Sequence, residues 1–168
     1  DLLGIGRQLI ADPYYPEKIA TGRYDEVVSC LSCNICLDTA MYEHKQLRCS
    51  VNPAVADEEE HTIILAAKPK KVFVVGSGPA GMEAAVVAAK RGHRVTIFEK
   101  EDFLGGQLIM AAVPPHKREL ERYRQHMINI VEKSGVVVKK GRTATADIVL
   151  RGKPDAVVVA TGVTPNIP

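Results

Sequence analysis

The sequence predicts an α/β fold in which a parallel sheet occupies residues 68–168. Four short apolar runs recur along this region, at 72–75, 95–98, 136–138 and 156–159. Runs of this length are typical of strands that are buried on both faces. Segments with a helical pattern separate the runs, and right-handed crossovers join strands that alternate with helices. The order of the elements therefore predicts parallel pairing.

The helices of this region have local signals of their own. Residues 82–90 are rich in alanine, and the Arg91-Gly92 pair that follows predicts the helix end. Residues 117–133 carry apolar side chains near helical spacing, which predicts a long helix with one core-facing side. Residues 146–150 predict a short helix before the final strand.

The first 67 residues show less regular patterning. Residues 1–6 predict a short buried strand, 7–11 a helical turn, 16–21 a short helix, 35–42 a helical stretch, and 54–69 a connection. Charge separates this part from the rest, because residues 1–67 carry a net charge of −6 and residues 68–168 one of +8. The sign changes at Lys68, which predicts a domain boundary there.

Composition excludes several classes of function. The whole chain of 168 residues has a net charge of only +2, which argues against a general nucleic-acid binder. No apolar run approaches the roughly 18 residues that a membrane-spanning helix needs. We therefore expect neither a nucleic-acid nor a membrane partner.

A glycine-rich turn follows the first predicted strand. Gly76-Ser77-Gly78-Pro79-Ala80-Gly81 fits the Gly-x-Gly-x-x-Gly pattern, with a helix after it. These glycines permit a tight turn, close approach of a pyrophosphate, and close packing of helix on strand. Glu99 ends the next strand, 18 residues after Gly81, where a carboxylate can bind a ribose hydroxyl and would repel a 2′-phosphate. The pattern predicts a Rossmann-like site for FAD, NAD or ADP, with Lys100 beside it.

The four cysteines form one group. Two residues separate Cys30 from Cys33 and Cys33 from Cys36, and twelve residues separate Cys36 from Cys49. Three close thiolates and one remote thiolate suit a 4Fe-4S cluster. The alternatives are structural zinc, which usually takes two Cys-x-x-Cys pairs, and thiols that are unligated or form disulfides.

Two further motifs carry a resemblance to flavoproteins that have two dinucleotide-binding domains. Gly105-Gly106-Gln107 follows the glutamate-ending strand, and Ala160-Thr161-Gly162 ends the last strand. The resemblance implies that this first nucleotide-binding fold holds FAD and that Gly106, Gln107, Ala160, Thr161 and Gly162 approach it. ADP alone and NAD remain alternatives.

The cysteine segment resembles a more specific family. Cys33-Asn34 and Cys49-x-x-Asn52-Pro53 are similar to the iron–sulfur segment of 2,4-dienoyl-CoA reductase, 2-enoate reductase and trimethylamine dehydrogenase, the NADH:flavin oxidoreductases related to Old Yellow Enzyme. Residues 1–13 resemble the last strand and loop of their FMN-binding TIM barrel, where Gly6 and Arg7 match the positions that hold the FMN phosphate. The resemblance implies an internal fragment in three parts: barrel end (1–28), iron–sulfur segment and linker (29–67), and incomplete FAD-binding domain (68–168).

The resemblance also implies a function. The first possibility is a reductase, in which NAD(P)H reduces FAD and the 4Fe-4S cluster passes electrons to FMN. The FMN then reduces an enoate or enoyl double bond. The two-residue gap between Cys33 and Cys36 is closer to the amine dehydrogenases, which carry ADP in the second site and give electrons to an external flavoprotein. A non-catalytic nucleotide-binding segment is the third possibility.

The expected setting follows from the same resemblance. It implies a cytoplasmic homo-oligomer whose partners are a small-molecule substrate, the remainder of the parent chain and, in the amine-oxidising case, an electron-transfer flavoprotein. No acid–base catalytic residue is assigned, and we expect the isolated chain to be inactive.

Overall fold

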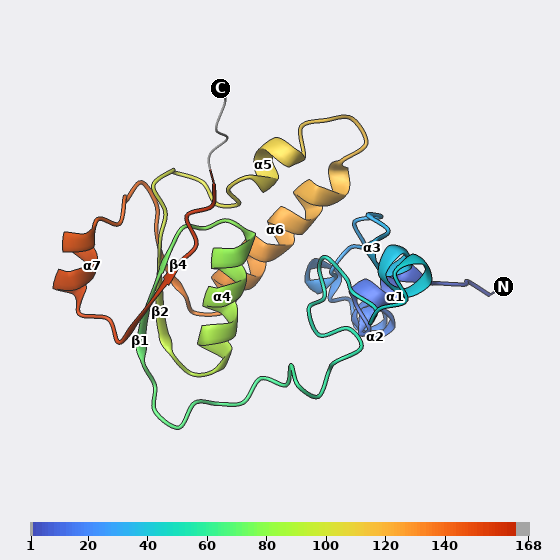
Figure 1. The fold of residues 1–168 in the computed structure, drawn as a ribbon, viewed down its shortest axis with the longest axis horizontal. Helices are drawn as coiled ribbons and strands as arrows, with labels where there is room; N and C mark the ends of the chain where they lie inside the picture. The colour runs from blue at the N-terminus through green and yellow to red at the C-terminus, as the bar shows by residue number, and fades with distance from the viewer. Residues whose placement is uncertain (1, 164–168) are drawn as a thin grey trace.

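The computed structural model describes residues 2–163, and a four-stranded parallel sheet forms its C-terminal part (Figure 1). The strands are β1 (Lys71–Val75), β2 (Arg94–Phe98), β3 (Val137–Lys139) and β4 (Ala156–Val159), in the order β3-β2-β1-β4. Val72 pairs with Val95 on one side and with Ala156 on the other. The predicted α/β fold and parallel pairing are confirmed. All four carboxyl ends therefore lie at one edge of the sheet.

Helices cover the sheet on both faces (Figure 1). The helices α4 (Pro79–Lys90) and α6 (Arg118–Lys133) lie on one face, and α7 (Ala146–Gly152) lies on the other. Alternation along β1 explains this layering, because successive side chains point to opposite faces. Val72 and Val74 join the core formed with α4 and α6, whereas the ring of Phe73 lies against Gly152 at the end of α7.

The core lies between the sheet and the helices α4 and α6. Its buried members are Val72, Val74, Met82, Ala85, Val86, Val95, Ile97, Leu104, Met127 and Val131. The apolar side of the predicted long helix is thus confirmed as core. A short helix, α5 (Leu108–Ala111), was not predicted from its four residues. No helix in residues 2–163 is long and apolar enough to cross a lipid bilayer.

The N-terminal segment is built from short helical pieces. They are α1 (Arg7–Ala11), α2 (Tyr15–Ala20), the 3-10 turn η1 (Tyr24–Glu26), and α3 (Ile35–Leu37), which continues as the π-helix η2 (Asp38–Tyr42). These pieces confirm the predicted turn, short helix and helical stretch. Residues 54–69 form the predicted connection and contain no helix or strand.

The predicted strand at residues 1–6 is wrong for residues 2–6, which the structure describes. They pair with no strand, and the side chains of Leu2 and Leu3 are exposed. A strand needs neighbours that complete its hydrogen bonds and cover its apolar face. The described part of the chain contains no such neighbours for this segment, so the apolar pattern alone does not produce a strand. Asp1 lies outside the described residues.

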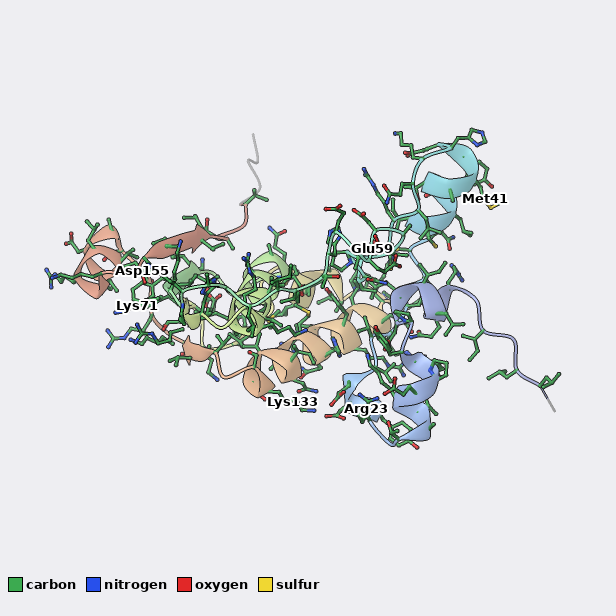
Figure 2. The ribbon with its side chains drawn as sticks, turned by 90° about the horizontal axis from the view of Figure 1, so that it is seen from below. Arg23, Met41, Glu59, Lys71, Lys133 and Asp155 are labelled. Atoms are coloured by element: carbon green, nitrogen blue, oxygen red, sulfur yellow. The ribbon has the colours of Figure 1, made fainter. Side chains whose placement is uncertain are left out.

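The N-terminal segment contacts the C-terminal sheet and its helices through α6. Lys133 Nζ lies 2.5 Å from Asp25 Oδ2 and 3.8 Å from a carboxylate oxygen of Glu26. Figure 2 shows Lys133 beside the segment that carries Arg23, whereas Met41 lies apart from both, at the top right of this view. Inside the segment, the carboxylate of the buried Asp12 accepts a hydrogen bond from Lys18 Nζ at 2.8 Å and from the Val28 N–H at 3.0 Å.

Candidate nucleotide site and cysteine segment

A cavity of about 720 Å³ opens at the carboxyl edge of the sheet. Its walls are the turn after β1, the ends of β2 and β4, the segment 103–110 and the segment 142–144. Eleven of the predicted cofactor-binding residues line it: Gly76, Gly78, Pro79, Ala80, Glu99, Lys100, Gly106, Gln107, Ala160, Thr161 and Gly162. The structure therefore brings together residues that lie far apart in the sequence. A ligand crevice at this edge is the usual location in open α/β sheets.

The three glycines of the turn have different surroundings. Gly76 has a φ of +101°, and a Cβ there would lie 2.4 Å from the carbonyl oxygen of Ala160. A Cβ on Gly81, which lies behind the cavity, would lie 2.0 Å from the carbonyl oxygen of Gly76. In contrast, no protein atom lies within 4 Å of a Cβ built on Gly78. The backbone at Gly78 therefore faces open space, as close approach of a pyrophosphate requires.

The helix α4 adds an electrostatic preference for an anion. Gly78 is its N-cap, Pro79 is in its first turn, and no side chain caps its first N–H groups. Free N–H groups and the helix dipole favour a negative ligand at such an end. The cavity, the open face of Gly78 and this helix end together fit the diphosphate of an adenine dinucleotide.

Glu99 connects β2 to the glycine-rich turn. One carboxylate oxygen accepts hydrogen bonds from the Ser77 N–H at 2.8 Å and the Ser77 hydroxyl at 2.6 Å. The other oxygen accepts from the Glu101 N–H at 3.0 Å. Burial acts to raise the pKa of Glu99, but these hydrogen bonds outweigh it and lower the pKa below its ordinary value. The predicted contact with a ribose hydroxyl stays a prediction, and the structure shows that Glu99 also fixes the turn.

We expect the variant Glu99→Gln to lower the free energy of unfolding at pH 7 by about 2 kcal/mol, because hydrogen bonds to a charged acceptor are replaced by weaker ones. The folded-state pKa is depressed, so the ionised Glu99 stabilises the fold above its unfolded-state pKa, near 4.3. This contribution is lost as the pH falls from about 5 through the folded-state pKa. Urea unfolding between pH 3 and 7 should show that the difference between wild type and variant shrinks toward acid. A difference that is independent of pH would contradict this role.

Several cavity residues were not found from the sequence. They include Phe103, Met110, Arg142, Thr143 and Ala144. Arg142 follows the end of β3, and its N–H donates to the Glu99 carbonyl oxygen at 2.7 Å. For residues 142–144, a usable sequence signal is their position shortly after the predicted strand at 136–138, because the ends of all parallel strands meet at one edge of the sheet. Gln107 was predicted as a cofactor contact, and its side-chain amide donates to the Val163 carbonyl oxygen at 2.7 Å.

The cysteine segment brings its two parts close together. The Cys33 thiol lies 3.2 Å from the Ser50 hydroxyl, next to Cys49 in the sequence. Cys36 is buried, Cys33 is exposed, and Cys30 and Cys49 are partly buried. Within residues 2–163, no three or more His, Cys, Asp or Glu side chains are arranged as a metal-binding set. The assignment of the four cysteines as metal ligands therefore stays a prediction.

The chemistry of this segment nevertheless fits an iron–sulfur centre. Burial acts to raise the pKa of Cys33, but hydrogen bonds from Ser50 and from backbone N–H groups, together with the charge of Arg7, lower it. The Ser32 N–H also donates to the Cys30 sulfur at 3.4 Å. Ser32 and Asn34, on either side of Cys33, have φ values of +54° and +62°. Such N–H···S contacts favour thiolates, the form that binds iron.

The predicted FMN-phosphate residues lie at the start of α1. Gly6 is the N-cap of this helix. The guanidinium of Arg7 donates a hydrogen bond to the Asn34 side-chain oxygen, so it lies beside the cysteine segment. Contact of Gly6 and Arg7 with an FMN phosphate stays a prediction.

Known proteins match the chain along its whole length. A family model described as FAD dependent oxidoreductase matches residues 71–149. NADH oxidase from Thermoanaerobacter brockii is 44% identical over 170 residues, which is 100% of this chain and 26% of the oxidase. Cinnamate reductase from Clostridium sporogenes is 38% identical over 99% of this chain and 25% of its own length.

Solved structures give the same result. A 2-naphthoyl-CoA reductase superposes with a TM-score of 0.92 and 40% identity, over 96% of this chain and 25% of that one. Histamine dehydrogenase from Rhizobium sp. 4-9 gives a TM-score of 0.87 and 31% identity, over 96% of this chain and 24% of its own. The chain thus spans about a quarter of the length of the relatives that it matches. Residues 71–149 thus match an FAD-dependent oxidoreductase domain, and almost the whole chain is similar to a part of oxidoreductases that include NADH oxidase, the cinnamate and 2-naphthoyl-CoA reductases and histamine dehydrogenase.

Proposed function

We propose that the chain is the FAD-binding and cluster-binding part of an iron–sulfur flavoenzyme that reduces a conjugated double bond. The observation that supports this most strongly is the cavity, which eleven predicted residues line, among them Gly78 with its open face. When bound, the two groups would supply the redox chemistry: FAD would supply hydride exchange with NAD(P)H, and a 4Fe-4S cluster would supply single-electron transfer to FMN. The protein supplies position, orientation and electrostatics.

The residues have distinct tasks in this proposal. The face of Gly78 and the start of α4 bind the pyrophosphate, and Glu99 holds both the turn and a ribose hydroxyl. Cys30, Cys33, Cys36 and Cys49 would hold the cluster, and Gly6 with Arg7 would hold the FMN phosphate. We propose domain limits of 1–28, 29–67 and 68–168 for the three parts.

The substrate class rests on the relatives. Cinnamate and 2-naphthoyl-CoA, which name two of them, are conjugated acids or thioesters, and this supports an enoate or enoyl-type substrate. Histamine dehydrogenase supports the second candidate, an amine dehydrogenase with ADP in the cavity, as does the spacing of the cysteines. In that case the electrons would go to an external electron-transfer flavoprotein. For both candidates we propose a cytoplasmic homo-oligomer.

The nucleotides and metals of the protein distinguish the candidates. The full-length protein that contains this chain should be purified anaerobically, its absorbance spectrum recorded, and its released nucleotides and metals identified. We expect FMN, FAD and about four irons, as one cubane cluster requires. ADP in place of FAD would contradict the reductase and favour the amine dehydrogenase. Zinc without iron would contradict both, and a segment that binds nucleotide without any metal would support a non-catalytic role.

A further inference from the structure

The helix α1 contacts both parts of the cysteine segment. The side-chain oxygen of Gln8 accepts a hydrogen bond from the Cys30 N–H at 3.0 Å, and its amide nitrogen donates to the Val28 carbonyl oxygen at 2.8 Å. From the other part, the Asn52 side-chain amide donates to the Ile10 carbonyl oxygen at 2.8 Å. One helix of five residues thus joins the loop of Cys30 to the loop of Cys49.

Gln8 provides hydrogen-bond partners for the loop that leads into Cys30. Residues 27–34 form neither helix nor strand, so their backbone groups need other partners. The Gln8 amide offers an acceptor and a donor, and it satisfies both the N–H of Cys30 and the carbonyl of Val28. The Val28 N–H in turn donates to the buried carboxylate of Asp12, just after α1. The path of the chain into Cys30 is therefore set from α1.

The contact with Asn52 acts on the second loop in the same way. Its side-chain oxygen accepts from the Ala54 N–H at 3.2 Å, so one amide joins its own turn to the end of α1. Asn52 lies three residues after Cys49. Ligands from separate segments bind one metal centre only if the segments are held at a fixed relative position, and the groups that hold the ligands strongly affect metal retention.

We propose that Gln8 and Asn52 are positioning residues that hold the loops of Cys30 and Cys49 on α1, so that the thiols can share one iron–sulfur cluster. The inference rests on the proposed function, because it requires that the cysteines bind a cluster. It goes further by assigning the geometry of the site to residues outside the cysteine motif. Since α1 begins at Arg7, the same helix would also set the distance from the cluster to the predicted FMN-phosphate contact.

Two variants of Gln8 and one control test this proposal in the full-length protein, purified anaerobically. Gln8→Ala removes both hydrogen bonds, whereas Gln8→Glu keeps the acceptor for the Cys30 N–H and loses the donor to Val28. Gln46→Ala is the matched control, because Gln46 also donates to a backbone carbonyl, that of Ala56 at 2.8 Å, within the same segment. The readouts are iron per chain, the rate at which a chelator bleaches the cluster absorbance, the midpoint potential of the cluster, and FAD per chain.

We expect Gln8→Ala to bind the cluster about 10–100-fold more weakly than wild type, the usual effect of removing a group that orients a metal ligand, so that a chelator bleaches it faster. FAD content should be unchanged, because the FAD cavity contains no residue of α1. Gln8→Glu should be intermediate in bleaching rate, Gln46→Ala should match wild type, and the potential of the remaining cluster should shift in Gln8→Ala but not in Gln46→Ala. Asn52→Ala should also destabilise the cluster.

Three results would overturn the proposal, and they can be told apart. Gln8→Ala that matches Gln46→Ala in both bleaching rate and potential would refute the positioning role alone. A parallel loss of iron and FAD in Gln8→Ala would show a general folding defect. Wild-type protein that holds FAD but no iron would overturn this inference together with the iron–sulfur part of the proposed function.

Discussion

Gly81→Ala is expected to lower the free energy of unfolding by about 4 kcal/mol or more, a loss in the range of severe steric overpacking. The added Cβ would lie 2.0 Å from the Gly76 carbonyl oxygen, which belongs to the backbone of the tight turn. Neither α4 nor the turn can move without disturbing β1, whose side chains Val72 and Val74 are in the core. Urea unfolding followed by circular dichroism measures the effect.

Gly4→Ala is the control for this experiment, because no atom lies within 4 Å of a Cβ built on Gly4. It should unfold within about 0.5 kcal/mol of wild type, as surface substitutions usually do. If Gly81→Ala were as stable as Gly4→Ala, the close packing of α4 on the turn would be incorrect.

Gly78→Ala is expected to separate nucleotide binding from folding. Gly78 has φ −66° and ψ 177°, which any residue adopts, and a Cβ there meets no protein atom. The methyl group would instead occupy the space that the pyrophosphate needs. We expect FAD affinity to fall at least about tenfold, equivalent to about 1.4 kcal/mol, with stability nearly unchanged. Fluorescence titration with FAD and a thermal unfolding curve measure the two quantities.

An unchanged FAD affinity in Gly78→Ala would contradict the predicted contact between this residue and the pyrophosphate. The two glycines are three residues apart, and a Cβ would meet backbone at Gly81 but open space at Gly78, so the two variants should separate folding from nucleotide binding.

The sheet and the nucleotide cavity could be predicted from the sequence because several signals agree there. Each strand is an apolar run of strand length, the turn after β1 has three spaced glycines, and Glu99 ends the next strand. In a parallel sheet such residues meet at one edge regardless of their separation in sequence. Arg142 was missed although it follows β3, because its own residue type carries no motif.

The N-terminal part could be predicted only in pieces. Its helices are short, and the predicted strand at 1–6 is wrong for residues 2–6 because a strand depends on neighbours that no local pattern reveals. The contacts of Gln8 and Asn52 also had no sequence signal, because a single amide that satisfies a loop backbone has no periodicity. The motif predicts four cysteines as metal ligands, which stays a prediction, whereas only the structure shows which hydrogen bonds hold their loops.

The central claim is that the cavity at the end of β1 binds the ADP portion of FAD. A competition titration tests it most directly: FAD is bound to the full-length protein after removal of its nucleotides, and ADP or FMN is added in separate experiments. We predict that ADP displaces FAD from one site and that FMN does not, because Gly78 and Glu99, which both line the cavity, are proposed to bind the diphosphate and the adenosine ribose. Displacement of that FAD by FMN but not by ADP would contradict the account.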